Sequence, residues 1–189
     1  MNARRLGLFG GTFDPPHVGH VAALRSVART GRFSEIEVTV AGDPYLKTKD
    51  VSPAAQRLAM AREAFDGLDL VHVSDREIRR RGPSYTIDTV RELFATGAFD
   101  DVDLIVGADL VGQLDAWHEA SALRDLVMVG VVPRPGSATT LPPGWRAYEI
   151  PMDPVDLSST FIRSIAKNSG DLSNYLPAGV VPLYQGARD

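Results

Sequence analysis

The sequence predicts an α/β fold in which a doubly wound, mostly parallel sheet of five to six strands precedes a small C-terminal helical subregion. Two observations carry this prediction. Short apolar or β-branched runs alternate along the chain with segments of roughly 10 to 14 residues that have helical periodicity, which is typical of parallel sheets with helices on both faces. The chain has 189 residues and no repeat, low-complexity tract or clear linker. A single domain over residues 1–189 is therefore expected, with the helical subregion at about 156–189.

The first half of the chain opens with an apolar run that ends at glycine, residues 5–10, which indicates a buried strand. Residues 18–30 have apolar side chains at helical spacing. Residues 35–41 are β-branched and alternating, which is typical of a strand. Residues 52–65 predict a helix that starts with Ser52 as N-cap and a proline at the first helical position.

The pattern continues with a third strand at 68–74 and a helix at 84–97 that stops at a glycine. A fourth strand is expected at 102–107 and a fifth at 125–132. The segment rich in proline and glycine at 133–144 is expected to be a surface loop within the domain.

The tail contains a short helix at 158–168, and Pro182 limits any helix beyond it. A basic run, REIRRRG at 76–82, is the one conspicuous cluster of charge. One interpretation of it is a solvated loop or helix end. Another is a local cationic surface for a phosphorylated ligand, and the sequence leaves both open.

Composition excludes several classes of function. Apolar residues make up 44% and charged residues 23% of the chain, which is ordinary for a globular protein. There is no cysteine, so disulfides, thiolate chemistry and cysteine-ligated zinc are excluded. The net charge of −4 argues against binding a nucleic acid polymer. The start has no long apolar run, so we expect a cytoplasmic enzyme with no membrane association.

The segment GLFGGTFDPPHVGH, residues 7–20, carries the strongest functional signal. A P-loop needs a lysine after its glycines, and no lysine occurs before position 47. The glycine spacing of a dinucleotide-binding fingerprint is also missing. His17 and His20 can share a helix face, but no acidic partner is near, so no metal ligand is predicted.

Phosphate chemistry fits this segment. Gly10 and Gly11 leave amides open to close approach by a ligand, and a helix that follows presents its partly positive end to an anion. Two imidazoles on its first turn can stabilise charge that develops during phosphoryl or nucleotidyl transfer.

GGTFDPPHVGH resembles the signature of the H-x-G-H nucleotidyltransferases. The chain is more closely similar to the bacterial nicotinate-nucleotide adenylyltransferases. Four further segments match that family in order and spacing: GPSYTIDTV at 82–90, GADLVGQLDAW at 107–117, RPG at 134–136 and LSSTFIRS at 157–164. The resemblance covers almost the whole chain and implies the family's Rossmann-like nucleotidyltransferase fold.

The resemblance implies an ATP side built from the first and last parts of the chain. His17 and His20 would contact the triphosphate, with His20 nearest the α-phosphate. The implied nucleotide-binding residues are Gly10, Gly11, Thr12, Phe13, Gly107, Asp109, Arg134, Ser159 and Thr160, with Arg163 on the phosphates. Simpler roles stay open for two of these segments, because LSST can be a plain helix N-cap and Asp109 can cap the helix after the fourth strand.

It also implies an acceptor side. Ser84, which can cap the following helix, Tyr85 and Thr86 would bind a carboxylate at the first turn of that helix. Trp117 would stack on a pyridine ring, or pack as a core aromatic. Lys47 stands at the family's lysine position and is assigned to phosphate, with Lys49 as a competitor. Leu46 replaces the family's histidine, and this departure from the family pattern concerns the acceptor side rather than the ATP side.

The implied reaction is adenylyl transfer from ATP to nicotinate mononucleotide, giving the dinucleotide and pyrophosphate. The acceptor is already an anion, so no general base is needed, and Mg²⁺ should accompany ATP, held mainly by phosphate oxygens and water. Two alternatives remain: a sister transferase for nicotinamide mononucleotide or phosphopantetheine, and a non-catalytic nucleotide-binding protein. The sequence also leaves open whether the chain forms a homo-oligomer.

Overall fold

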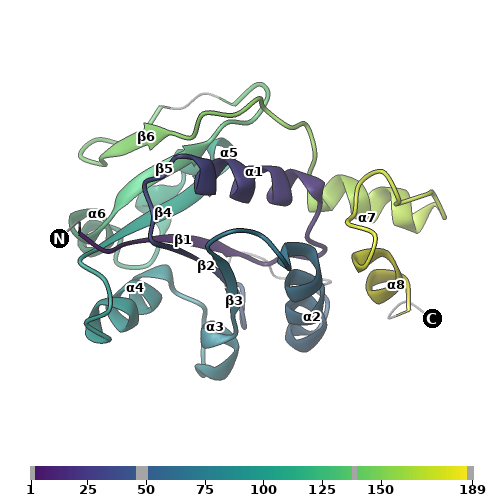
Figure 1. The fold of residues 1–189 in the computed structure, drawn as a ribbon, viewed down its shortest axis with the longest axis horizontal. Coiled ribbons are helices and arrows are strands. Elements are labelled where there is room, and N and C mark those ends of the chain that lie inside the picture. The colour runs from purple at the N-terminus through teal and green to yellow at the C-terminus, as the bar shows by residue number, and fades with distance from the viewer. Residues whose placement is uncertain (1–2, 46–50, 138–139, 187–189) are drawn as a thin grey trace.

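The computed structural model describes residues 3–45, 51–137 and 140–186 and contains a six-stranded, all-parallel sheet in the order β3-β2-β1-β4-β5-β6 (Figure 1). The strands are β1 (Arg5–Gly11), β2 (Glu35–Val40), β3 (Val71–Ser74), β4 (Asp101–Gly107), β5 (Met128–Val132) and β6 (Ala147–Glu149). This confirms the predicted α/β class. None of the helices in the described part of the chain is long and apolar enough to cross a membrane.

The strand order reverses between β1 and β4. The chain runs from the central β1 outward through β2 and β3, then returns to place β4 on the other side of β1. In open parallel sheets, ligands bind beyond the carboxyl ends of the strands at such a reversal. Gly11 ends β1 and Gly107 ends β4, so these glycines lie where a ligand is expected.

Helices cover both faces of the sheet. They are α1 (Val18–Arg29), α2 (Ala54–Phe65), α3 (Arg76–Arg79), α4 (Thr86–Ala95), α5 (Ala108–Val111), the 3₁₀ turn η1 (Leu114–Ala116), α6 (Ala120–Leu126), α7 (Ser159–Lys167) and α8 (Val180–Gln185). In Figure 1, α1 lies above the sheet and α4 below it. This arrangement creates two apolar cores. Side chains of β1 point to alternate faces of the sheet and so contribute to both cores. Leu6 and Leu8 pack with Val90 of α4, whereas Phe9 packs with Leu24 of α1.

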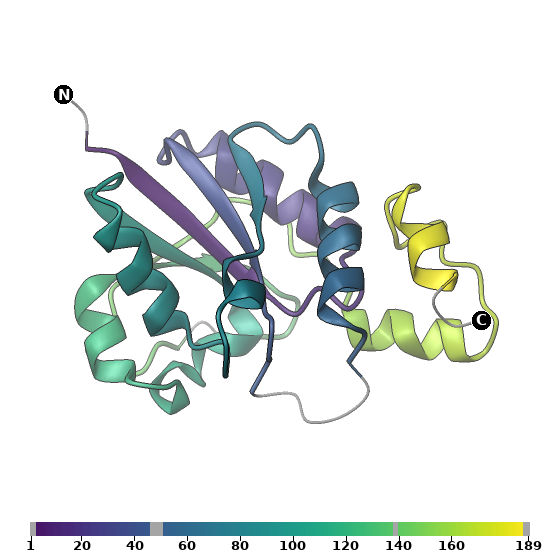
Figure 2. The ribbon, with the colours of Figure 1, turned by 90° about the horizontal axis from the view of Figure 1, so that it is seen from below.

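The C-terminal helices form the predicted subregion. Figure 2 shows α7 and α8 standing beside α2, and α8 contacts α2. Ile162 of α7 and Val180 of α8 are fully buried in the same core as α1. Pro182 lies inside α8, where its missing N–H falls in the first turn and costs no intrahelical bond. Pro182 therefore does not prevent a last helix, because it lies in the first turn of α8.

Several predicted boundaries need correction. Ser52 does not cap α2, because the N-cap is Pro53 and the Ser52 amide instead donates to the Asp14 carboxylate at 3.0 Å. The fifth strand begins at Met128, since the preceding residues form α6. A sixth strand, β6, follows the 133–144 segment and was not predicted, because three residues carry too little periodic signal.

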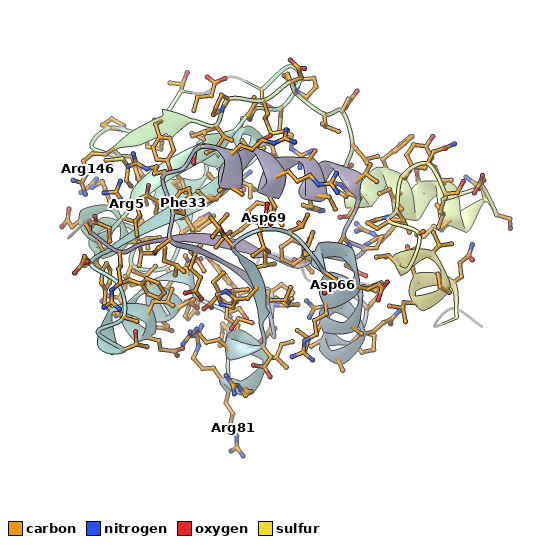
Figure 3. The ribbon with its side chains drawn as sticks, in the orientation of Figure 1. Arg5, Phe33, Asp66, Asp69, Arg81 and Arg146 are labelled. Carbon is orange, nitrogen blue, oxygen red and sulfur yellow. The ribbon has the colours of Figure 1, made fainter. Side chains whose placement is uncertain are left out.

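The basic run at 76–82 is only partly solvated. Arg76 and Arg80 both pair with Glu92 of α4, at 3.5 and 2.9 Å. Figure 3 shows Arg81 pointing away from the fold. The interpretation as a solvated loop or helix end therefore holds for Arg81, whereas Arg76 and Arg80 fasten α3 to α4.

Candidate active site at the reversal of strand order

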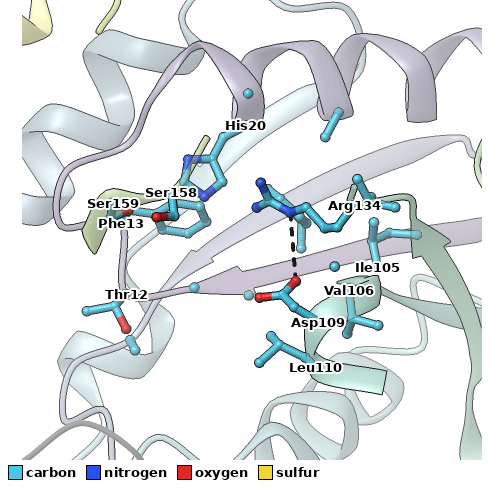
Figure 4. A pocket seen from close by; sticks show the side chains of 18 of the residues that line it. Thr12, Phe13, His20, Ile105, Val106, Asp109, Leu110, Arg134, Ser158 and Ser159 are labelled. Atoms are coloured by element: carbon cyan, nitrogen blue, oxygen red, sulfur yellow. Dashed lines mark ion pairs between the residues drawn. The ribbon is translucent and has the colours of Figure 1, made fainter. Parts of the chain in front are cut away.

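A cavity of about 500 Å³ opens at the carboxyl ends of β1, β4 and β5 (Figure 4). Its volume is in the range of small-molecule sites. The predicted site residues that line it are Gly10, Gly11, Thr12, Phe13, His17, His20, Ser84, Thr86, Gly107, Asp109, Trp117, Arg134, Ser159 and Thr160. Tyr85 and Arg163 lie outside this lining. Lys47 and Lys49 lie outside the described residues, so their roles stay predictions.

The end of β1 leaves room for a ligand. A Cβ added at Gly10 would meet nothing within 4 Å, and Gly10 is exposed to the cavity. A Cβ at Gly11 would lie 2.8 Å from the Phe13 ring. Phe13 itself adopts a left-handed backbone, with φ at 50°, and its buried ring packs on His20. The turn therefore needs glycine at Gly11 for space, while Gly10 offers its backbone to a bound molecule.

The two histidines of HVGH form a stacked pair at the start of α1. His17 is the N-cap residue, and its amide donates to Nδ1 of His20 at 3.1 Å. The ring centroids are 3.7 Å apart. Because Nδ1 accepts this bond, neutral His20 carries its proton on Nε2, where it is a donor. A Cβ at Gly19 would lie 3.0 Å from Nδ1 of His17, which explains the glycine between the histidines.

His17 is held neutral. Its side chain is 1% exposed, and burial, followed by the nearby charge of Arg134, lowers its pKa from 6.5 to about 3. A neutral imidazole can donate one hydrogen bond to an anion without the cost of burying a charge before the anion arrives. His17 therefore suits a site that fills with phosphate.

Arg134 and Asp109 form an ion pair in the lining of the cavity, drawn as a dashed line in Figure 4. Nε of Arg134 lies 3.7 Å from Oδ1 of Asp109, and its Nη1 donates to the carbonyl of Leu157 at 2.6 Å. Gly107, not Asp109, is the N-cap residue of α5, so the alternative that Asp109 caps this helix is wrong. The Asp109 carboxylate lies beside Gly107 and the Arg134 guanidinium, in the lining of the cavity.

The start of α7 is attached to the loop after β1. Ser158 is the N-cap, since its hydroxyl accepts from the Phe161 amide at 3.2 Å. The Ser159 hydroxyl donates to the Pro15 carbonyl at 2.9 Å. Arg163 donates to the Asp14 carbonyl at 2.8 Å and to the Thr160 hydroxyl at 3.0 Å. The plain-cap interpretation of LSST therefore applies to Ser158, which also lines the cavity and was not predicted as a site residue.

Ser84 has a different role from the predicted cap. The N-cap of α4 is Tyr85, and the Ser84 hydroxyl accepts from the amides of Gly42 and Asp43 at 2.9 and 3.1 Å. Ser84 thus joins the segment after β2 to the start of α4. Thr86, the first residue of α4, lines the cavity, and the first amides of a helix have no partner within the helix.

Glu77 lines the cavity and was missed by sequence reasoning. It is buried, accepts from the Thr89 hydroxyl at 2.6 Å, and has its pKa raised by burial. Nothing in the local sequence marks a glutamate within a basic run as a cavity residue. Its position follows only from the packing of α3 against β2.

Trp117 has the predicted core contact, and its stacking on a pyridine ring stays a prediction. Its half-buried ring packs against the core under α4 and α6 and also lines the cavity. Beside it, His118 stacks on Tyr85 with centroids 3.9 Å apart, and Tyr45 meets Tyr85 edge-on at 4.9 Å. Sequence reasoning missed Tyr45, which lines the cavity, whereas His118 lies outside this lining.

The donor set does not resemble a protein-built metal centre. In residues 3–45, 51–137 and 140–186 there is no group of three or more His, Asp or Glu side chains that could hold a metal ion. Asp109, which lines the cavity, pairs with Arg134. A cation in this cavity would therefore depend on oxygen atoms that its ligand brings.

Similarity to known proteins agrees with this geometry. A family model described as cytidylyltransferase-like matches residues 8–165. A probable nicotinate-nucleotide adenylyltransferase of Albidiferax ferrireducens is 41% identical over 131 residues, which cover 69% of this chain and 66% of that protein. Another, of Geobacillus kaustophilus, is 35% identical over 177 residues, which cover 93% of this chain and 81% of that protein.

A solved structure has the same fold. Plasmodium falciparum nicotinic acid mononucleotide adenylyltransferase, complexed with NaAD, superposes with a TM-score of 0.82 at 16% identity, over 97% of this chain and 95% of that one. At 16% identity this superposition shows the fold alone. The family is shown by the sequence relatives and by the cytidylyltransferase-like family model. The chain belongs to the cytidylyltransferase-like nucleotidyltransferases and, within them, to the nicotinate-nucleotide adenylyltransferases.

Proposed function

We propose that this protein transfers an adenylyl group from ATP to nicotinate mononucleotide, forming nicotinate adenine dinucleotide and pyrophosphate. One observation carries the proposal. A single cavity is lined by the His17–His20 pair, which suits a triphosphate, and by the first turn of α4 with Trp117, which suits a pyridine nucleotide. A transferase needs both subsites open to the same space.

On the ATP side, the backbone at Gly10 would lie against the nucleotide, because no side chain obstructs it. His20 would donate from Nε2 to the α-phosphate, and neutral His17 would donate to a neighbouring phosphate oxygen. Ser158 to Thr160, at the start of α7, line the same cavity, and a helix start favours an anion. Arg163 acts here through Asp14 and Thr160, by holding this helix start in place.

On the acceptor side, the amides at the start of α4 would receive the carboxylate of the nicotinate ring. Thr86 is the first residue of that helix, and Ser84 fixes the approach of the chain to it. Trp117 would lie against the ring. Lys47 is proposed to contact phosphate on this side.

The reaction exchanges one P–O bond for another. An oxygen of the acceptor phosphate attacks the α-phosphorus of ATP, and the bond from that phosphorus to the bridging oxygen of the β-phosphate breaks. The electron pair leaves with pyrophosphate. No proton has to be removed from the attacking oxygen, so the protein contributes position and hydrogen bonds to the charge that builds on the α-phosphate.

Mg²⁺ is proposed to enter with ATP. When bound, it neutralises charge on the phosphates and on the leaving pyrophosphate. The described residues fit this mode because they offer no three-ligand cluster of their own, so the triphosphate and water would supply most ligands.

The test is pyrophosphate release from MgATP across three acceptors: nicotinate mononucleotide, nicotinamide mononucleotide and phosphopantetheine. The product should be identified by mass. Fast release with nicotinate mononucleotide alone supports the proposal. Release with phosphopantetheine alone would assign a sister transferase, and ATP binding without release with any acceptor would assign a non-catalytic protein.

A further inference from the structure

Arg57 of α2 is buried between the loops that border the cavity. Its side chain is 1% exposed, and its guanidinium donates four hydrogen bonds, each to a main-chain carbonyl. Nε bonds Ser52 at 2.8 Å, Nη1 bonds Thr12 at 2.9 Å and Ala41 at 2.6 Å, and Nη2 bonds Gly42 at 3.3 Å. One side chain therefore connects the loop after β1 with both ends of the segment between β2 and α2.

Two of these carbonyls, those of Thr12 and Gly42, connect Arg57 to the two halves of the site. Thr12 lines the cavity directly after the glycines of the ATP side. The Gly42 amide donates a hydrogen bond to the hydroxyl of Ser84, which directly precedes the N-cap of α4 on the acceptor side. The hydrogen bonds thus run from Thr12 through Arg57 to Gly42 and on to Ser84.

Two further contacts hold the segment after β2 against its neighbours. Asp14 is 3% exposed and accepts from the Ser52 amide at 3.0 Å, which adds a second tie between the same two loops. Gly42 packs against α3 so closely that an added Cβ would meet the Glu77 carbonyl. The segment after β2 is therefore held from both sides.

Arginine is suited to this bridge in a way that other residues are not. Its three nitrogens diverge in one plane and reach carbonyls on different segments, whereas lysine has a single nitrogen. An apolar side chain would fill the space without the cost of burying a charge. Burial lowers the pKa of Arg57, and the nearby Asp14 charge partly opposes this shift. A buried guanidinium at this position of α2 therefore points to a role for its four hydrogen bonds.

We propose that Arg57 is a positioning residue that sets the distance between the ATP subsite and the acceptor subsite. This inference rests on the proposed function. Transfer needs the acceptor phosphate in line with the α-phosphorus at roughly van der Waals contact, and small misplacements cost large factors in rate. Arg57 is not among the described residues that line the cavity, so it would act through the two loops.

The experiment compares ligands that fill one subsite with a ligand that spans both. AMP fills the ATP subsite, nicotinate mononucleotide fills the acceptor subsite, and nicotinate adenine dinucleotide fills the two together. The product of the two mononucleotide Kd values, divided by the dinucleotide Kd, is the effective concentration of one half for its subsite. Calorimetric titration gives this ratio for the wild type and for Arg57→Lys.

In Arg57→Lys the ratio should fall at least about tenfold, while each mononucleotide Kd changes less than about threefold. In steady-state assays kcat should fall by a similar factor, with KM for ATP nearly unchanged. An unchanged ratio, or equal weakening of all three ligands, would overturn the positioning role.

Arg32→Lys is the matched control. Arg32 pairs with Asp103 at 2.7 Å and contacts Met128, at the end of the sheet opposite the cavity. It should lower Tm without changing the ratio, and a similar fall of the ratio in this control would also overturn the proposal. If Arg57→Lys does not fold, Asp14→Asn tests the same bridge by weakening its bond to Ser52. The ratio should then fall about threefold, and an unchanged ratio again refutes the role.

The two proposals fail in different ways. A wild-type protein that forms no dinucleotide from MgATP and nicotinate mononucleotide refutes the proposed function. A wild-type protein that forms it, together with an Arg57→Lys variant whose ratio and kcat are unchanged, refutes the positioning role alone.

Discussion

Acid should destabilise the ligand-free protein through His17, and His17→Asn should remove that effect. The folded pKa of His17 is about 3 and its unfolded value is 6.5. Between these values the unfolded chain binds the extra proton, so stability from neutral His17 is present above pH 6.5 and is lost as the pH falls. From pH 7.5 to pH 5.0 the loss is about 2 kcal/mol, since each pH unit below 6.5 costs about 1.36 kcal/mol.

Urea unfolding of the wild type and His17→Asn at both pH values measures this loss. The substitution lowers stability at each pH by removing a packed ring, so the informative quantity is the change between pH 7.5 and 5.0. That change should be about 2 kcal/mol less destabilising in His17→Asn than in the wild type. Glu37, whose pKa is lowered to about 2 by its partners His72 and Arg76 against the effect of burial, adds little above pH 5.

His72→Gln is the matched control with the opposite sign. Hydrogen bonding to Glu37, assisted by the Glu35 charge, raises the pKa of His72 despite burial. The stability it contributes is therefore fully present below the unfolded pKa and is lost as the pH rises through the folded pKa. His72→Gln should cost more at pH 5.0 than at pH 7.5. An equal pH dependence in His17→Asn and the wild type would refute the argument that His17 is buried in its neutral form.

Three further predictions concern catalysis. His20→Ala should reduce kcat about 10²- to 10³-fold with little change in ATP affinity, because its Nε2 donor would meet charge that grows in the transition state; kcat above about a third of the wild-type value in a stopped assay would remove His20 from this role. Trp117→Ala should weaken nicotinate mononucleotide and spare ATP in calorimetric titrations, by about 0.5–1.5 kcal/mol beyond the lost contact area; equal weakening of both ligands with a large drop in Tm would mark Trp117 as a core residue only. The kcat/KM for nicotinate mononucleotide should exceed that for nicotinamide mononucleotide about 10- to 100-fold at saturating MgATP, because the first backbone amides of α4 favour a carboxylate. Equal values would show that the start of α4 does not bind the carboxylate.

The longer strands of the sheet could be predicted because each carries a clear local pattern. β1 is an apolar run that ends at glycine, β2 alternates β-branched with polar residues, β4 is largely apolar, and the helices between them repeat at helical spacing. β6 and α3 have three and four residues, which is too short for periodicity to register. Their existence depends on neighbours, since β6 pairs with β5 and α3 packs on β2.

Most of the predicted site residues do line the cavity, because the family motifs fall at strand ends and helix starts. The hydrogen-bond partners of the individual side chains could not be predicted. Ser84 satisfies the cap pattern, yet its hydroxyl accepts amides from a segment about forty residues earlier. Arg57 lies in a helix whose sequence gives no reason to expect four carbonyl partners. These partners depend on how loops that are distant in sequence pack together, which local patterns do not encode.

The attachment of α7 to the loop after β1 has a consequence for how the protein becomes active during synthesis. Every strand of the sheet is complete once residue 149 has been made, whereas Ser158 to Thr160, which close the nucleotide side of the cavity, and Arg163, which fixes them to Asp14, are made afterwards. Domains generally fold as units. A chain that ends before this segment lacks both part of the nucleotide side of the cavity and part of the core, and we expect ATP to be bound productively only when translation of this segment has finished.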